Sequence, residues 1–201
     1  MGKIVVSENV SIDGVVQDPV GDEGFSRGGW VGRVGDPGRE GAAKVLLDEA
    51  RSAQAQLLGR RSYEFLAARW PSRSGQLADR LNSLPKYVVS STMEDPKWGN
   101  TTVLKGDVLA EVSRLKDELS GEILVAASFQ LVRAPFEHDL VDEMRLMVYP
   151  AVVGAGERLF GEASDKKAMR LVSTETIGDL ARLVFEVVGP EGMTRGSEAR
   201  R

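Results

Sequence analysis

Hydrophobic residues occur along the chain in short runs that are separated by glycine, proline and polar residues. Runs rich in aliphatic and β-branched residues predict strands at 3–6, 56–58, 86–90, 101–104 and 122–126. Further strands are expected at 143–149, where apolar residues alternate with others, at 169–173 and at 180–188. Gly178-Asp179, between the last two, is typical of a tight hairpin turn. The pattern therefore predicts about eight strands.

Segments with helical spacing of apolar residues lie between many of these strands. Helices are predicted at 42–53, 63–70, 76–81 and 129–138, and a further one directly after Asp107. Asp107 and Ser128 are expected to act as N-caps, because their side-chain oxygens can accept a first-turn amide. Residues 17–41, rich in glycine, aspartate and proline, predict a lid, a binding loop or a disordered segment.

The order of these elements indicates the fold class. Strands and helices alternate until residue 143, and strands alone complete the chain. This order predicts an α/β fold with a mostly parallel central sheet, an antiparallel C-terminal edge and helices on both faces. We expect one domain at 1–188 and a polar, flexible tail at 189–201.

Composition excludes several classes of protein. The 201 residues, 42% of them hydrophobic, suffice for the core of one domain. The net charge of -4 is spread without a basic stripe, so no nucleic-acid partner is expected. The chain has no cysteine and a single histidine, His138, which argues against a thiol nucleophile, a histidine-built metal site and a Ser-His-Asp triad. No metal is expected, and redox chemistry would need a bound organic cofactor.

The sequence also indicates where the protein works. No apolar run is long enough to span a bilayer, and the first residues lack the apolar region of a signal peptide. We therefore expect no membrane association and a cytoplasmic location.

Three predicted strands end in residues that suit an anion. Gly59-Arg60-Arg61-Ser62 follows one strand, Ser90-Ser91-Thr92 ends another, and Ala127-Ser128 follows the strand at 122–126. Ligands of open α/β sheets bind beyond the carboxyl ends of strands, where helix amides, hydroxyls and guanidinium groups can hold phosphate. The same residues also suit ordinary turns and solvated charges, so spacing alone leaves both interpretations open.

Four motifs together occur in the order and at the spacings of the dihydrofolate-reductase-like superfamily. They are Lys3-Ile-Val-Val-Ser with Ser11-Ile-Asp-Gly14, Leu57-Leu-Gly-Arg-Arg-Ser-Tyr-Glu64, Tyr87-Val-Val-Ser-Ser91 and Tyr149-Pro-Ala-Val-Val-Gly-Ala-Gly156. Over residues 3–188 the chain most resembles the bacterial RibD C-terminal family, the reductase domain of riboflavin biosynthesis. The resemblance implies the three-layer dihydrofolate-reductase-like fold.

The resemblance also implies NADPH as the cofactor. Arg60 would meet the adenosine 2′-phosphate, and the stretch that begins at Ala127 would receive the diphosphate. Ala127 and Phe129 stand where the family usually has glycine, and Pro135 interrupts the following helix. The full set of implied cofactor-binding residues is Gly59, Arg60, Arg61, Ser62, Ser90, Ser91, Ala127, Ser128, Phe129 and Gln130.

A small-molecule substrate would bind beside the nicotinamide. Asp13 is the candidate catalytic residue, although a turn aspartate that binds its own backbone is an equally good interpretation. The carboxylate that dihydrofolate reductases carry on their first helix falls near Ala42 or Ala43 here, whereas Asp48 and Glu49 are expected to face solvent. The implied substrate-binding residues are Val6, Asn9, Ser11, Trp30 (as a lid or as a loop anchor), Pro150 and Gly154.

The resemblance therefore implies an NADPH-dependent oxidoreductase that transfers hydride to a small polar carbonyl or imine. The model reaction is the riboflavin-pathway reduction of 5-amino-6-(5-phosphoribosylamino)uracil. One alternative is reduction of a pterin, dihydrofolate or flavin ring, and another is a non-catalytic, nucleotide-binding dimeric scaffold. A homodimer is expected through the last strands, because pairing there would protect an open sheet edge.

Overall fold

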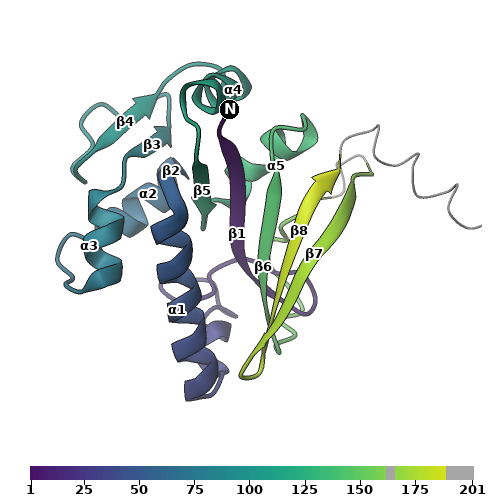
Figure 1. Ribbon diagram of the computed structural model, residues 1–201. Coiled ribbons are helices and arrows are strands. Elements are labelled where there is room, and N and C mark those ends of the chain that lie inside the picture. The colour runs from purple at the N-terminus through teal and green to yellow at the C-terminus, as the bar shows by residue number, and fades with distance from the viewer. Residues whose placement is uncertain (162–165, 189–201) are drawn as a thin grey trace, which may run out of the picture.

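A single eight-stranded sheet with helices on both faces forms the protein (Figure 1). The computed structural model describes residues 1–161 and 166–188, so the tail predicted at 189–201 lies outside the described residues. The strands are β1 (Lys3–Ser11), β2 (Ala53–Gly59), β3 (Lys86–Val89), β4 (Thr101–Leu104), β5 (Glu122–Ala126), β6 (Glu143–Tyr149), β7 (Ala168–Ile177) and β8 (Leu180–Val188). The helices are η1 (Trp30–Arg33), α1 (Asp36–Ser52), α2 (Arg60–Ala67), α3 (Gln76–Ser83), α4 (Val108–Glu118) and α5 (Phe129–Glu137).

The strands lie in the order β4-β3-β2-β5-β1-β6-β8-β7. All neighbours from β4 to β6 are parallel, whereas β8 pairs antiparallel with both β6 and β7. The central strand β1 pairs with β5 from Lys3↔Glu122 onward and with β6 from Val5↔Glu143 onward. The α/β fold with an antiparallel C-terminal edge is thus confirmed.

Two hydrophobic layers enclose the sheet because successive side chains of a strand point to opposite faces. Ile4 and Val6 of β1 pack towards α4 and α5, together with Val112 and Val132. Val5 points the other way, into the cluster that α1, α2 and α3 cover. Because both faces of these strands are buried, their sequences are continuous apolar runs rather than alternating apolar and polar residues.

Several boundaries differ from the predicted ones. Strand β1 continues through polar residues to Ser11, because β6 pairs with it as far as Ser11↔Tyr149. Helix α1 begins at Asp36 rather than at 42, with Pro37 in its first turn, where proline needs no hydrogen-bond partner for its nitrogen. Ala53, predicted to end that helix, is instead the first residue of β2.

Two local signals are confirmed and one is not. Asp107 caps α4 by accepting a hydrogen bond from the Ala110 amide at 3.0 Å, and Gly178 takes a positive φ of 58° in the hairpin turn. Ser128 precedes α5 as predicted, but its hydroxyl makes no capping bond. It instead accepts the Gly59 amide at 3.2 Å and donates to the Ala126 carbonyl at 3.3 Å, so it ties the end of β2 to the end of β5.

Candidate functional site

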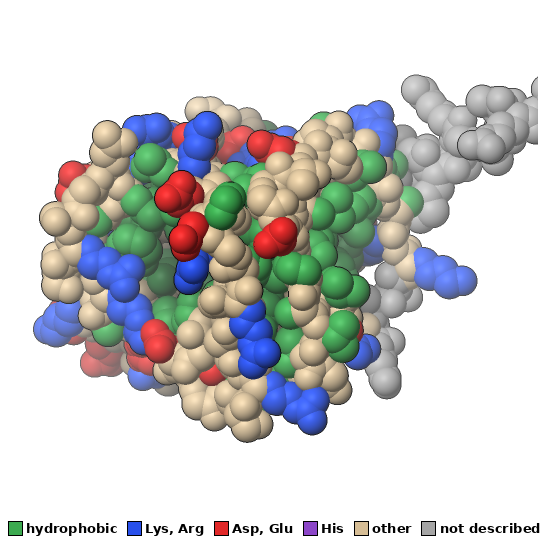
Figure 2. Space-filling model, turned by 90° about the horizontal axis from the view of Figure 1, so that it is seen from below, with side chains coloured by type: hydrophobic (Ala, Val, Ile, Leu, Met, Phe, Trp, Pro, Cys, Tyr) green, Lys and Arg blue, Asp and Glu red, His purple; other side chains and the backbone are tan. Residues whose placement is uncertain are grey.

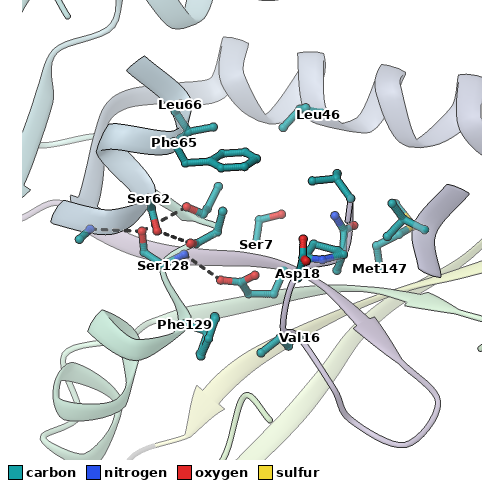
Figure 3. A pocket seen from close by; sticks show the side chains of 18 of the residues that line it. Ser7, Val16, Asp18, Leu46, Ser62, Phe65, Leu66, Ser128, Phe129 and Met147 are labelled. Carbon is teal, nitrogen blue, oxygen red and sulfur yellow. Dashed lines mark hydrogen bonds between the residues drawn. The ribbon is translucent and has the colours of Figure 1, made fainter. Parts of the chain in front are cut away.

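A cavity of about 660 Å³ opens at the carboxyl ends of the parallel strands, where ligands of such sheets bind. Figure 2 shows this face, on which hydrophobic side chains lie between acidic and basic groups. Leu46 of α1 and Phe65 of α2 form one wall (Figure 3). Ser7, Asp18 and Met147 lie across from them.

Two helices direct their N-terminal ends into this cavity. Neither α2 nor α5 has a side-chain cap, so their first amides have no side-chain acceptor. The two ends are joined to each other, because the Ser62 hydroxyl donates to the Ala127 carbonyl and the Gly59 amide donates to the Ser128 hydroxyl. Free amides and the positive ends of two helix dipoles suit an anion at this junction.

Arginine side chains stand beside the same junction. The Nε of Arg60 lies 2.7 Å from Glu64, and its Nη1 donates to the Thr92 hydroxyl. Arg61 forms an ion pair of 2.6 Å with Glu23 of the opposite loop. Because these pairs are largely exposed, a phosphate would compete with the carboxylates for the guanidinium groups without a large loss of stability.

The residues that replace glycine at the junction are accommodated in different ways. Ala127 takes a positive φ of 56°, a conformation that is unfavourable by about 1–2 kcal/mol for a residue with a Cβ. Phe129 packs against the hydrophobic cluster that contains Leu57 and Val132, while its ring also lines the cavity.

Most of the expected cofactor-binding residues meet in this cavity. Those that line it are Gly59, Arg60, Arg61, Ser62, Ala127, Ser128, Phe129 and Gln130. Ser90 and Ser91 are not among the lining residues. Ser90 is buried, and its hydroxyl accepts the Met93 amide at 3.1 Å, which is ordinary turn chemistry.

Asp13 bridges two loops and does not line the cavity. One carboxylate oxygen accepts the Ser11 hydroxyl at 2.7 Å and the Val153 amide at 3.0 Å, and the other accepts the Gly154 amide at 2.8 Å. The Ser11 hydroxyl, followed by these amides, lowers the pKa of Asp13 to about 2. A carboxylate that is always ionised near neutral pH does not donate protons, so this geometry gives Asp13 a structural role.

The expected substrate-binding residues are brought together only in part. Asn9 lines the cavity, whereas Val6, Ser11, Trp30, Pro150 and Gly154 do not. Trp30 is 3% exposed, and its indole donates to the Gln17 carbonyl at 3.0 Å. Its ring packs edge-on against Tyr149. Trp30 therefore anchors the loop, which is the second of its two predicted roles.

Glu49 contradicts the expectation that it faces solvent. Its side chain is only 4% exposed, accepts the Ser7 hydroxyl at 2.7 Å and pairs with Arg182 at 3.1 Å. Arg182 lies on β8, so no local signal in the first helix identifies this partner. Glu49 and Ser7 both line the cavity, and the ion pair fixes this part of the wall.

Two further buried acidic residues of the cavity were not among the predicted site residues. Asp18 is buried, and its carboxylate accepts the amides of Gly21, Glu23 and Phe25 at 2.9–3.1 Å, which orders the loop that was predicted as a lid or binding loop. Glu8 is also buried, and burial raises its pKa to about 8. The available signal was a glutamate shortly after the apolar run of β1. Within residues 1–161 and 166–188, no group of three or more His, Asp or Glu side chains is placed to hold a metal ion.

Comparison with known proteins agrees with this architecture. Residues 2–182 match the RibD C-terminal domain family. The uncharacterized protein YwjB of Bacillus subtilis (strain 168) is 25% identical over 183 residues, which cover 91% of this chain and 97% of YwjB.

Two solved structures share the fold. A putative riboflavin biosynthesis protein from Shewanella sp. PV-4 has a TM-score of 0.72 and 20% identity, over 92% of this chain and 99% of that one. Dihydrofolate reductase from Enterococcus faecalis, complexed with NADP(H) and RAB-propyl, has a TM-score of 0.55 and 11% identity, over 92% and 96% of the two chains. The predicted dihydrofolate-reductase-like fold is thereby confirmed. Because the family match extends over residues 2–182, the chain belongs to the RibD C-terminal domain family.

Proposed function

We propose that the protein is an NADPH-dependent reductase of a small polar carbonyl or imine, similar to the riboflavin-pathway reductase. The observation that carries this proposal is the junction at which α2 and α5 direct two uncapped N-terminal ends into one cavity beside Arg60. Membership of the RibD C-terminal domain family supports a reductase-like role. The NADP(H) bound to the structurally similar dihydrofolate reductase supports the choice of cofactor.

The residues at the junction fit a dinucleotide diphosphate. The first amides of α5, from Phe129 and Gln130, would bind the phosphate oxygens, and Ser62 would exchange its bond to Ala127 for one to phosphate. Arg60 would hold the 2′-phosphate. When bound, NADPH would supply the hydride, so the protein positions the substrate and excludes water.

The apolar part of the cavity would receive the nicotinamide and the substrate. Val16, Leu46, Phe65 and Met147 line it and would keep water from the reacting atoms. Pterin or dihydrofolate is a less suitable substrate, because Ala42 and Ala43 line the cavity where a dihydrofolate reductase would place its carboxylate. The nearby Glu49 is already bound to Ser7 and Arg182.

Replacing Arg60 with alanine should weaken NADPH binding by about 1.5–3 kcal/mol and leave NADH binding nearly unchanged, because only NADPH carries the 2′-phosphate. Titration calorimetry with both cofactors measures this difference. Arg114→Ala is the matched control, since Arg114 also pairs with a glutamate four residues on, at 2.5 Å, but lies on α4 and does not line the cavity. Equal losses for NADPH and NADH in Arg60→Ala would contradict the role of Arg60.

The same titration separates the reductase from the non-catalytic scaffold. A wild type that does not bind NADPH at millimolar concentration would contradict the proposed function and favour the scaffold. In that case the strained Ala127 and the bulky Phe129 would be the residues that prevent binding.

We also propose that the protein is a homodimer that pairs through β7. This strand is one of the two edges of the sheet, and Leu171 and Val172 on it are 52% and 58% exposed. Pairing of two edges would satisfy the free backbone groups and cover these side chains. Light scattering at micromolar concentration should give twice the mass of the 21.8 kDa chain, and a monomer mass would contradict the proposal.

A further inference from the structure

A buried carboxyl group lines the cavity beside the junction of α2 and α5. Glu8 is 7% exposed and lines the cavity from β1, next to the first turn of α5. Its Oε1 accepts the Ser128 amide at 3.1 Å, as a dashed line at Ser128 in Figure 3 shows. Its Oε2 makes no hydrogen bond to any residue within 1–161 and 166–188. Glu8 is therefore held at one oxygen and free to bind a ligand at the other.

No basic side chain in the described ranges pairs with Glu8. Its neighbour in the β6 register is the apolar Leu146, and α5 offers it only the Ser128 amide. The Arg73 guanidinium lies over the Trp70 ring, 4.9 Å from its centroid. Apart from Glu8, Arg73 and Tyr149, each ionisable group that lines the cavity, or that binds a lining residue of α5, has its own polar partner. These pairs are Asp18 with three loop amides, Asp22 with Arg69, Glu23 with Arg61, Arg60 with Glu64, Glu49 with Arg182, and Glu157 with Gln130 and Arg133.

Burial without a cationic partner favours the neutral acid. It raises the pKa of Glu8 to about 8, although the Ser128 amide acts in the opposite direction. Glu8 therefore carries a proton at neutral pH. The other carboxylates that line the cavity accept hydrogen bonds from loop amides or form ion pairs. Burial raises the pKa of the Tyr149 phenol above its ordinary value, so Tyr149 releases its proton less readily.

We propose that Glu8 is a catalytic acid, which gives its proton to the substrate nitrogen or oxygen while the neighbouring carbon receives the hydride. This inference rests on the proposed reductase function. As a C–H bond forms with hydride from the reduced nicotinamide, the π electron pair of the C=N or C=O bond moves to the heteroatom. The Glu8 O–H bond breaks and an N–H or O–H bond forms there.

The ionised Glu8 that results keeps the Ser128 amide as a donor, at the positive end of the α5 dipole. It regains a proton from water through the open cavity before the next turnover. One hydride from the reduced nicotinamide and one proton from solvent thus convert the double bond into a CH–NH or CH–OH group.

The protonation state can be tested on the protein without a ligand. We would measure unfolding in urea from pH 4.5 to 9 for the wild type and for Glu8→Gln, which keeps the shape and the acceptor of the neutral acid. The unfolded Glu8 ionises near pH 4.5 and the folded one near pH 8, so the wild type loses stability between these values. Glu8→Gln has no carboxyl group at this position and does not share this loss. The ratio of the two folding constants, Glu8→Gln over wild type, should therefore rise about a thousandfold between these pH values and then stay constant.

Glu94→Gln provides the matched control, because Glu94 is an exposed glutamate in the loop after β3, and this variant should follow the wild type throughout. Infrared spectra at pH 7 should show the C=O band of a protonated carboxyl group that disappears in Glu8→Gln. Parallel stability profiles for wild type and Glu8→Gln would overturn the inference.

A second measurement separates this inference from the proposed function. With NADPH and 5-amino-6-(5-phosphoribosylamino)uracil, Glu8→Gln should bind NADPH like the wild type but slow single-turnover NADPH oxidation by about 100- to 10,000-fold. The wild-type rate should fall above pH 8. An unchanged rate in Glu8→Gln would overturn the role of Glu8 alone. Failure of the wild type to bind NADPH or oxidise it would overturn the reductase function, and the role of Glu8 with it.

Discussion

Replacing Arg182 with methionine should lower the free energy of unfolding by about 3–5 kcal/mol, because it leaves a buried carboxylate without its cation. Arg182 donates to Glu49 at 3.1 Å, and their side chains are only 19% and 4% exposed. Removing the guanidinium group leaves Glu49 with the Ser7 hydroxyl as its remaining partner among the described residues. Urea unfolding at pH 7 measures the loss.

The same hairpin contains the matched control. Arg170 on β7 pairs with Glu186 on β8, but its side chain is 71% exposed, so Arg170→Met should change stability by less than about 1 kcal/mol. The double variant Glu49→Met/Arg182→Met should recover most of the loss, since apolar replacements of a buried pair are often neutral. An Arg182→Met protein as stable as Arg170→Met would show that the pair between α1 and β8 contributes little.

Raising the pH from 8 to 10.5 should stabilise the wild type by about 3 kcal/mol relative to Lys86→Met. Lys86 is fully buried on β3, where its ammonium group donates to the carbonyls of Asn82, Leu84 and Gly99 and lies 4.3 Å from the ring centroid of Trp98. Burial lowers its pKa from 10.5 to about 8. Between these values the unfolded chain binds a proton that the folded one lacks, so stability rises with pH.

Chemical unfolding of both proteins across this interval tests the sign as well as the size of the effect. Other lysines and tyrosines titrate in the same range, but their contributions cancel in the difference between the two proteins. Lys97→Met is the control, because Lys97 is exposed and pairs with Asp95, and its curve should run parallel to the wild type. A parallel curve for Lys86→Met would contradict the effect of burial on Lys86.

The fold followed from the sequence wherever local signals and burial agree. The strands at 101–104, 122–126, 143–149 and 180–188 have the predicted bounds, since each is a short apolar or alternating run between turn residues. Helix α1 begins at Asp36, before the predicted start at 42. Its first turn contains glycine, proline and charged residues, which do not favour a helix by themselves, so only packing on the sheet favours a helix there.

The candidate site was predictable only where its residues are adjacent in the sequence. Gly59 to Ser62 and Ala127 to Gln130 follow strands directly, so the topology places them at one edge of the sheet. Glu49 was predicted to face solvent and Ser128 to cap a helix. Both predictions were wrong, because the hydrogen-bond partners of these residues, on β8 and at the end of β2, lie far away in the chain. Tertiary contacts of this kind replace the local solvation or capping that a sequence pattern suggests.

The position of β1 between β5 and β6 has a consequence for synthesis on the ribosome. Strand β1 leaves the ribosome before the other strands of the sheet, yet both strands that flank it come from residues 122–149. The strands β2, β3 and β4 are consecutive neighbours, so they can associate with α2 and α3 while the chain is still growing. Strand β1 therefore has no partner strand until β5 has emerged, and its second partner, β6, follows later. During this interval the nascent chain exposes a short segment of high β-propensity to chaperones and to aggregation.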